Sequence, residues 1–304
     1  MKLVKPYFEI WEQPAGLEGV YKQIEKVGRV CYKSEDKITE DSAKPFVDRM
    51  IKSGHGAMLE HGTVYLKLET VKSAIHPLDK YYHNKYSKVC TEEGLTKQTK
   101  IVFVTTNLRV LIENDWMDDL QYLCELTEYH ERRVTVHFVC DRGVSHEFVR
   151  HRVMSFAQES TRYCNYSKDK FGNELTFIIP EWCPEIGEGS NKGWDPCSIY
   201  DKLYLQHLQN AEDTYFALLK QWDERVPDKR YKSGFKNNPW VAQQARAILP
   251  NSLKTELVVT GFTSDWNHFF DLRARGTTGA PHPQAKELAE PLMKEFIARK
   301  YINN

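Results

Sequence analysis

Residues 150–163 (R-H-R-V-M-S-F-A-Q-E-S-T-R-Y) combine three arginines, one histidine, several hydroxyl side chains and a tyrosine within fourteen positions. The planar guanidinium group of arginine can donate two parallel N–H hydrogen bonds to the oxygens of one phosphate group, and it keeps its charge at neutral pH. The hydroxyl groups of Ser160 and Thr161, next to Arg162, add donors suited to phosphate oxygens. The segment therefore predicts binding of phosphate, and its spacing allows two phosphate-bearing ligands.

A short basic run is also typical of an exposed helix end, where arginine and histidine complement the helix dipole. The residues before it favour the functional interpretation. Val144, Phe148 and Val149 form the apolar stripe of a short helix, so Arg150 and Arg152 follow packed structure directly. The linking residues M-S-F-A-Q-E show no clear period, which predicts an ordered loop lining a pocket.

The elements that must position these groups are predicted from the periodicity of the apolar residues. Alternation or continuous apolar runs predict strands at 7–11, 63–69, 134–139, 175–179 and 252–260, and a strand leading into a helix at 101–112. Helical spacing predicts helices at 17–32, 42–53, 116–130, 144–151, 195–226, 239–249, 264–275 and 284–301. Because strands and helices do not alternate strictly, we predict an α+β fold, with a mixed sheet and flanking helices, in a single domain over 1–304.

The composition argues against several classes of protein. The 304 residues contain 42 Lys+Arg and 42 Asp+Glu, so a generally basic surface for nucleic acid or membrane is not expected. No apolar run approaches the roughly 20 residues that span a membrane, and no signal peptide is recognisable at the start. We therefore expect a soluble, cytoplasmic protein. The seven cysteines are scattered without a C-x-x-C pair, which favours reduced thiols over disulfides or a metal site.

Three further segments accompany the R-H-R run: L-E-H at 59–61 before a strand, A-R-A-I-L-P at 245–250, and W-N-H-F-F-D-L-R at 266–273. Taken alone, the histidine of the first can hydrogen-bond a turn, and the arginine of the second can be an ordinary cation at a helix C-terminus. The aromatic residues of the third are expected in the core. Together with R-H-R, seven residues and then Ser, these segments resemble the flavin-dependent thymidylate synthases.

The resemblance covers most of 55–69 and 134–300, and it implies the fold of that family. It implies that FAD is bound by His61, Arg150, His151, Arg152 and His268. It implies that dUMP is bound by Glu147, Glu159, Ser160, Arg162, Tyr163, Arg246 and Arg273. It also implies that Arg273 is catalytic, because its guanidinium would stabilise the negative charge that builds on the uracil ring carbonyl.

The reaction implied by the resemblance converts dUMP to dTMP. Methylenetetrahydrofolate gives the one-carbon unit, NADPH reduces FAD, and the reduced flavin supplies the hydride. The chain would then be an FAD-dependent methyltransferase that uses no metal and no nucleophilic cysteine. In the resembled family the motifs converge between subunits, so the resemblance implies a homotetramer with active sites at subunit interfaces.

The chain departs from the family's pattern in three places. An insertion at about 70–133 separates the E-H strand from the R-H-R helix, Glu147 stands where a glutamine is usual, and the loop at 274–283 is longer. A second interpretation, another flavin-dependent nucleotide-modifying oxidoreductase, therefore stays open. A third is a nucleic-acid-binding module, against which the neutral charge argues. Cysteine-dependent thymidylate synthesis without flavin would need an essential thiol.

Overall fold

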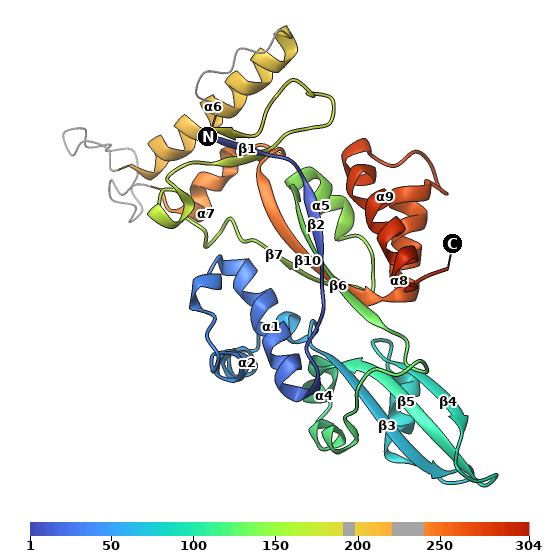
Figure 1. Ribbon diagram of the computed structural model, residues 1–304. Coiled ribbons are helices and arrows are strands. Elements are labelled where there is room, and N and C mark those ends of the chain that lie inside the picture. The colour runs from blue at the N-terminus through green and yellow to red at the C-terminus, as the bar shows by residue number, and fades with distance from the viewer. Residues whose placement is uncertain (191–197, 221–239, 304) are drawn as a thin grey trace. The chain divides into compact units, whose positions relative to one another are not determined.

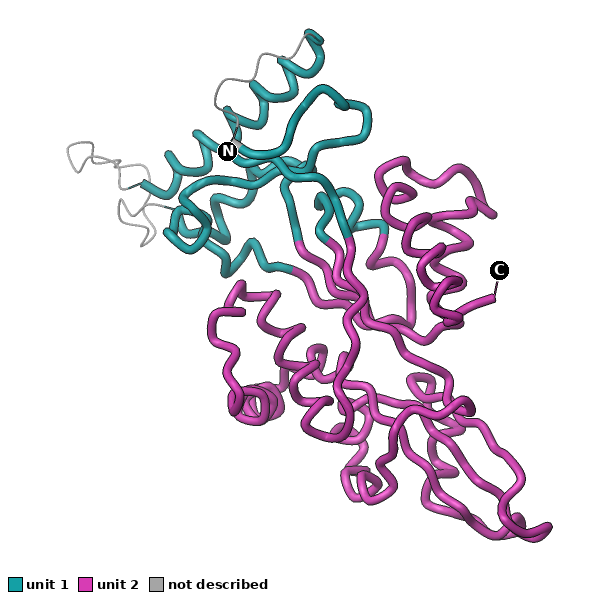
Figure 2. The backbone as a smooth tube through the Cα atoms, in the orientation of Figure 1, with its two compact units in different colours: residues 1–7, 139–147, 159–255 teal, residues 8–138, 148–158, 256–304 magenta. Residues whose placement is uncertain are grey.

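A computed structural model describes residues 1–190, 198–220 and 240–303, and its contacts divide the chain into two compact units, coloured separately in Figure 2. Unit 1 comprises residues 1–7, 139–147 and 159–255, and unit 2 comprises residues 8–138, 148–158 and 256–304. Each unit is therefore built from three separate stretches of the chain. The single domain expected from the sequence stays a prediction.

Unit 1 contains a small sheet with the strand order β8-β1-β9. β1 (Lys2–Val4) runs parallel to β8 (Thr176–Ile178) and antiparallel to β9 (Gly189–Ser190). The strand predicted at 175–179 is thereby confirmed, whereas β1 and β9 are too short to show a period in the sequence.

Two helices complete the regular structure of unit 1. α6 (Ile199–Leu219) begins after Ser198, whose hydroxyl accepts hydrogen bonds from the first backbone N–H groups of the helix. α7 (Ala242–Ala245) is short and continues as a 3-10 turn over Arg246–Ile248. The helices predicted at 195–226 and 239–249 are confirmed where the structure describes them; residues 195–197, 221–226 and 239 lie outside the described residues.

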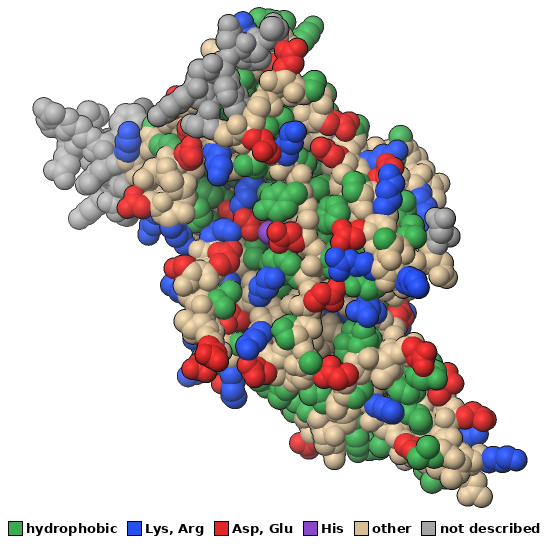
Figure 3. Space-filling model, in the orientation of Figure 1, with side chains coloured by type: hydrophobic (Ala, Val, Ile, Leu, Met, Phe, Trp, Pro, Cys, Tyr) green, Lys and Arg blue, Asp and Glu red, His purple; other side chains and the backbone are tan. Residues whose placement is uncertain are grey.

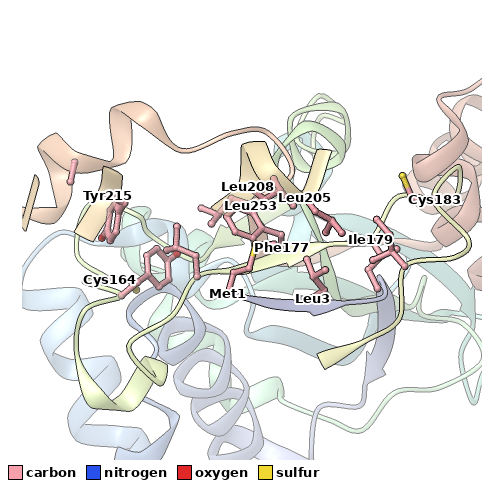
Figure 4. Close-up of a cluster of buried hydrophobic side chains, with 14 residues drawn as sticks. Met1, Leu3, Cys164, Phe177, Ile179, Cys183, Leu205, Leu208, Tyr215 and Leu253 are labelled. Carbon is pink, nitrogen blue, oxygen red and sulfur yellow. The ribbon is translucent and has the colours of Figure 1, made fainter. Parts of the chain in front are cut away.

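A buried apolar cluster holds unit 1 together (Figure 4). Leu3 of β1 and Phe177 of β8 contribute from the sheet, Leu208 and Tyr215 contribute from α6, and Leu253 closes the cluster. All five side chains are at most 1% exposed. The burial of apolar area, which is the main favourable contribution to folding, thus fixes α6 on the sheet of unit 1.

A four-stranded sheet, most of whose residues belong to unit 2, has the order β2-β6-β10-β7. Its strands are β2 (Tyr7–Trp11), β6 (Arg133–Asp141), β10 (Lys254–Phe262) and β7 (Ser155–Gln158). β7 runs antiparallel to β10. The loop predicted for the residues after R-H-R is therefore wrong in part, because four residues are too few to show the alternation that pairing with β10 reveals.

Helices pack on the part of this sheet that lies in unit 2 (Figure 1). α1 (Gly16–Tyr32) places Val27 and Val30 against Ala157 and Val258 of the two antiparallel strands. The other helices of unit 2 are α2 (Ala43–Lys52), α3 (Gly56–Leu59), α4 (Leu108–Glu113), α8 (Thr263–Phe270) and α9 (Pro283–Ala298). The helices predicted at 17–32, 42–53 and 284–301 are confirmed.

The insertion expected at about 70–133 supplies most of a second sheet in unit 2, with the order β3-β5-β4. β3 (Thr63–Val71), β5 (Thr99–Asn107) and β4 (Lys88–Glu93) are all antiparallel to their neighbours. The strand leading into a helix at 101–112 is confirmed by β5 and α4, which begins where the Asn107 side chain accepts from the backbone of Val110.

The helix predicted at 116–130 is wrong. Only a 3-10 turn forms there, at Met117–Tyr122. Beyond it Leu123 forms an antiparallel bridge with Leu66, and Cys124 N donates to the Tyr65 carbonyl at 2.9 Å. The open edge of β3 therefore satisfies the backbone groups of a segment whose apolar spacing looked helical.

Taken over the described residues, helices and mixed sheets confirm the α+β class. None of the described helices is long and apolar enough to cross a membrane. The six cysteines described by the structure form no disulfides with one another. On the face drawn in Figure 3, basic and acidic side chains are interspersed over each unit, as the equal numbers of the two kinds predict.

Candidate active site

The R-H-R residues follow directly after α5 (Arg142–Phe148). α5 begins where the Asp141 carboxylate accepts a hydrogen bond from a backbone N–H of the first turn at 2.7 Å. At its end the buried ring of Phe148 packs against Phe138 and Phe269, with ring centroids 5.0 Å apart in both pairs. Aromatic packing in unit 2 therefore fixes the position at which the basic run starts.

His151, His268 and Arg273 lie together in unit 2. Arg273 Nε donates a hydrogen bond to His151 Nε2 at 3.1 Å. The centroid of the buried His151 ring lies 6.0 Å from that of His268 and 4.9 Å from that of Phe269. Burial, followed by the charges of Arg273 and His268, lowers the pKa of His151 to about 4. The imidazole is therefore neutral at neutral pH and accepts the guanidinium N–H.

Arg273 itself lies in a π-helix over Asp271–Arg275, which follows α8 where the sequence predicted a continuous helix. A π-helix has a wider turn than an α-helix and often marks a functional site. Arg275 pairs back to Asp271 at 2.9 Å, and the turn ends at Gly276, whose φ of 70° suits glycine.

The other three residues expected at the flavin, His61, Arg150 and Arg152, differ in burial. His61 is fully buried, and its Nδ1 lies 2.8 Å from Thr260 Oγ1. Burial, followed by the charge of Arg133, lowers the pKa of His61 to about 3, so this histidine is neutral. Arg150 and Arg152 are exposed instead. The burial of His61 is not shared by its neighbour in the chain, because His55 is exposed.

Glu159 is the buried member of the set expected at the nucleotide, in unit 1. Its carboxylate accepts from the Tyr166 hydroxyl at 2.9 Å and pairs with Lys254 Nζ at 2.9 Å. Burial, followed by the Glu159 charge, raises the pKa of Tyr166. Tyr166 and Lys254 were not predicted from the sequence, although a buried carboxylate requires a cation nearby. Glu159 and Lys254 are 95 positions apart in the sequence, so no local pattern indicates that they pair.

Arg162 and Tyr163 are exposed in the same unit, next to the half-buried Ser160. Ser160 Oγ accepts from Arg162 N at 3.3 Å, and the Arg162 guanidinium lies over the Tyr163 ring at 5.2 Å. Arg162 Nε donates to the side-chain oxygen of Gln243 at 3.2 Å, a residue of α7 that the sequence analysis missed. This partner is neutral, so within the described part of the chain the hydrogen bond to Gln243 leaves the positive charge of Arg162 in place.

Arg246 and Glu147, which are also expected at the nucleotide, are both accessible to solvent at least in part. Arg246 is exposed directly after α7, and Glu147 is half-buried near the end of α5. Together, unit 1 holds Glu147, Glu159, Ser160, Arg162, Tyr163 and Arg246, and unit 2 holds His61, Arg150, His151, Arg152, His268 and Arg273. Among the described residues no group of His, Cys, Asp and Glu could hold a metal ion.

Comparison with known proteins identifies the family. Residues 126–299, which include the R-H-R run and the segment ending in Arg273, match the family model described as "Thymidylate synthase complementing protein". The chain belongs to this family. The matched range contains residues of both units described above.

Individual relatives agree with this family. The chain is 23% identical over 286 residues to the flavin-dependent thymidylate synthase of Corynebacterium aurimucosum, which covers 93% of this chain and 78% of that protein. It is 33% identical over 135 residues to the flavin-dependent thymidylate synthase of Thermococcus onnurineus, with 44% of this chain and 43% of that protein covered. The second match thus spans less than half of the relative.

A similar solved structure is that of the UMP/dUMP methylase PolB from Streptomyces cacaoi bound with 5-Br dUMP. The two chains share 16% sequence identity, at a TM-score of 0.41 over 98% of this chain and 93% of that one.

For a member of the thymidylate synthase complementing protein family, the geometry offers three chemical capabilities. A fixed guanidinium, Arg273, is aligned by a neutral histidine and can stabilise negative charge on a ligand. The exposed arginines can bind phosphate. Glu159, kept in place by Tyr166 and Lys254, can accept hydrogen bonds from a ligand's N–H or hydroxyl groups.

Proposed function

We propose that the chain is a flavin-dependent thymidylate synthase that converts dUMP to dTMP, with methylenetetrahydrofolate as the one-carbon donor and NADPH-reduced FAD as the source of the hydride. The observation that carries the proposal is the hydrogen bond from Arg273 Nε to His151 Nε2 at 3.1 Å. It joins the R-H-R run to the L-R segment that the resemblance assigns to the uracil ring. Two motifs 122 positions apart therefore meet through their functional groups.

Arg273 would act on the pyrimidine. Carbon 5 of uracil becomes nucleophilic as negative charge builds on a ring carbonyl, and a guanidinium close to that oxygen stabilises the charge. His151 is a positioning residue in this scheme, because its neutral Nε2 holds the Arg273 side chain in one orientation. Its low pKa keeps the acceptor available over the whole neutral range.

The arginines fit anionic ligands. Arg150 and Arg152 would bind the pyrophosphate of FAD, and Arg162 and Arg246 the phosphate of dUMP, with Ser160 adding a hydroxyl donor. The exposure of these four arginines supports this assignment. When bound, FAD supplies the redox chemistry, while the chain supplies binding, orientation and electrostatics.

The remaining assignments complete the proposal. Glu147, Glu159 and Tyr163 would contact dUMP, and His61 and His268 would contribute to the flavin site. The buried position of His61 limits it to an indirect role through Thr260 within the described chain. A homotetramer would bring flavin and nucleotide groups together at subunit interfaces, as symmetric assemblies allow.

The test is a visible absorption spectrum of the purified protein supplied with FAD and titrated with dUMP. We expect a flavin spectrum that shifts saturably with dUMP but not with dCMP, because the two ligands share one site. The Arg273→Lys variant should bind flavin and lose most of the shift, since lysine lacks the planar guanidinium. A flavin spectrum indifferent to dUMP would favour the altered oxidoreductase, and absence of flavin would contradict both.

A further inference from the structure

The two edges of the sheet β3-β5-β4 in unit 2 differ in how their backbone groups are satisfied. On the outer side of β3, Leu123 forms an antiparallel bridge with Leu66. Next to it, Cys124 N donates to the Tyr65 carbonyl at 2.9 Å. β4 lies at the opposite edge, and within the described residues its one strand partner is β5 (Figure 1). Such an edge strand presents backbone donors and acceptors that can pair with another strand.

The hydrogen bonds between β4 and β5 show which backbone groups of β4 point outward. Gly94 N donates to the Thr99 carbonyl at 3.0 Å, so this pair, directly after β4, is hydrogen-bonded. In an antiparallel ladder, hydrogen-bonded pairs alternate with pairs that are not hydrogen-bonded. The even-numbered residues of β4 therefore bond to β5. The N–H and C=O groups of Val89, Thr91 and Glu93 project to the open edge.

The sequence of β4 lacks two features that commonly prevent strand pairing. K-V-C-T-E-E contains no proline, and its register with β5 is continuous, without a bulge. Its charged residues Lys88, Glu92 and Glu93 are exposed. Charges on an edge strand oppose pairing where like charges face each other. β4 has its cation at the start and its anions at the end, so two antiparallel copies bring opposite charges together.

Symmetry restricts the registers in which two copies of β4 can pair. Directly opposite residues of a sheet project to the same face, so a two-fold axis passes between one residue and its own copy. With Cys90 at this centre, Lys88 of each copy lies opposite Glu92 of the other. Val89 then lies opposite Thr91, and the backbone groups of both already point outward. With Val89 or Thr91 at the centre, Lys88 faces no glutamate.

We propose that β4 pairs antiparallel with β4 of a second copy of this chain, in the register centred on Cys90. Each Val89–Thr91 pair exchanges two backbone hydrogen bonds across the interface. Two ion pairs between Lys88 and Glu92 flank the axis, and the two three-stranded sheets become one continuous sheet. This interface is independent of the proposed function, because none of the residues assigned to FAD or dUMP lies in β4.

Disulfide crosslinking of the full-length protein tests the pairing. In this register Cys90 faces its own copy in a pair that is not hydrogen-bonded, where Cα atoms lie about 4.5 Å apart. A disulfide spans about 4.4–6.8 Å between Cα atoms. We expect mild oxidation to give a disulfide-linked dimer on a denaturing gel without reductant. Cys90→Ser should abolish this dimer, and Cys124→Ser, at the other edge of the sheet, should keep it. Absence of the dimer in the wild type, or its persistence in Cys90→Ser, would overturn the proposal.

Exchange of the two charges tests the register. Lys88→Glu puts like charges opposite each other on both sides of the axis, and it should slow formation of the disulfide-linked dimer about tenfold. Adding Glu92→Lys to this variant brings opposite charges together again and should restore most of the rate. Lys67→Glu makes the same change at an exposed lysine of β3, away from this edge, and should leave the rate unchanged. A double variant as slow as Lys88→Glu alone would overturn the register centred on Cys90.

A backbone change separates this interface from other contacts between copies. Thr91→Pro removes an N–H that points to the open edge, so β4 should keep its hydrogen bonds to β5 while the disulfide-linked dimer is lost. Thermal unfolding checks that the variant is folded, and an unchanged dimer in the folded variant would overturn the pairing. If Thr91→Pro does not fold, the exchange of Lys88 and Glu92 carries the test.

The dUMP titration of the flavin spectrum tests the proposed function separately. Thr91→Pro should respond to dUMP like the wild type, whether or not the wild type shows the expected shift. A protein that binds no flavin should still form the disulfide-linked dimer through Cys90. Failure of the proposed function and failure of the β4 interface therefore give different results.

Discussion

The two units hold their functional side chains in different ways. In unit 2, Arg273 is oriented by a buried neutral histidine, itself packed among aromatic rings such as Phe269. In unit 1, Arg162 is exposed, and its side chain is held by the neutral amide of Gln243 and by Tyr163, which is 60% exposed. The comparison indicates that core packing fixes the group proposed for catalysis, whereas Arg162, which is proposed to bind the phosphate of dUMP, is held only by contacts at the surface.

The largest expected effect concerns Arg273. Arg273→Ala should lower the rate of dTMP formation by about a hundredfold or more, because removing one donor to a developing negative charge typically costs that much. Bound flavin, measured by its absorbance, should be retained. Arg275→Ala, which removes the bonds from that guanidinium to Asp271 and Asn267, should keep most of the activity. Equal losses in the two variants would contradict a special role for Arg273.

Glu159 should matter for stability because it is one of the buried charges of unit 1. Glu159→Gln leaves Lys254 without its carboxylate, and breaking a buried pair costs about 3 kcal/mol of unfolding free energy. Denaturant unfolding measures this loss. The exposed pair Lys44–Asp48 provides the control, since Asp48→Asn should change the unfolding free energy by under about 1 kcal/mol. A stability loss no larger than that of the control would contradict the assignment of Glu159 and Lys254 as a stabilising buried ion pair.

Two arginine-to-lysine changes sharpen the contrast between the units. Arg162→Lys should raise the KM for dUMP about tenfold without changing flavin content, because lysine cannot bind phosphate with two parallel N–H donors. Arg152→Lys should weaken FAD binding and leave the KM for dUMP unchanged. Steady-state kinetics and flavin titration measure the two effects. Exchange of the two phenotypes would show that the ligands are assigned to the wrong units.

The smallest effect should appear in the pH dependence of stability. The pKa of His151 is lowered from 6.5 to about 4 in the folded protein, so the unfolded chain binds the extra proton more readily. Stability should therefore fall as the pH drops from about 6.5 to about 4, and His151→Gln should make this fall shallower. The depressed pKa of His61 leaves part of the slope in place. Thermal unfolding at a series of pH values measures this dependence. If the slope of stability against pH is the same in His151→Gln as in the wild type, His151 is not a neutral buried histidine.

Local patterns were sufficient for much of the fold. α1, α2, α9, β3 and β10 were predicted because their apolar residues repeat with the period of a helix or a strand over nine or more residues. β7 and the segment at 116–130 were not, because pairing with β10 and with the edge of β3 decides their conformation. The helix predicted at 116–130 shows how tertiary hydrogen bonds override local spacing.

By itself, the sequence determined the kinds of chemistry available: paired guanidinium groups for phosphate, the R-H-R and L-R motifs, and the family to which they point. Only the tertiary structure decided that Arg273 donates to His151, that Glu159 pairs with Lys254, and that His61 is buried against Thr260. Residue type is a local property, whereas burial and partner choice depend on side chains that are brought together from more than ninety positions apart.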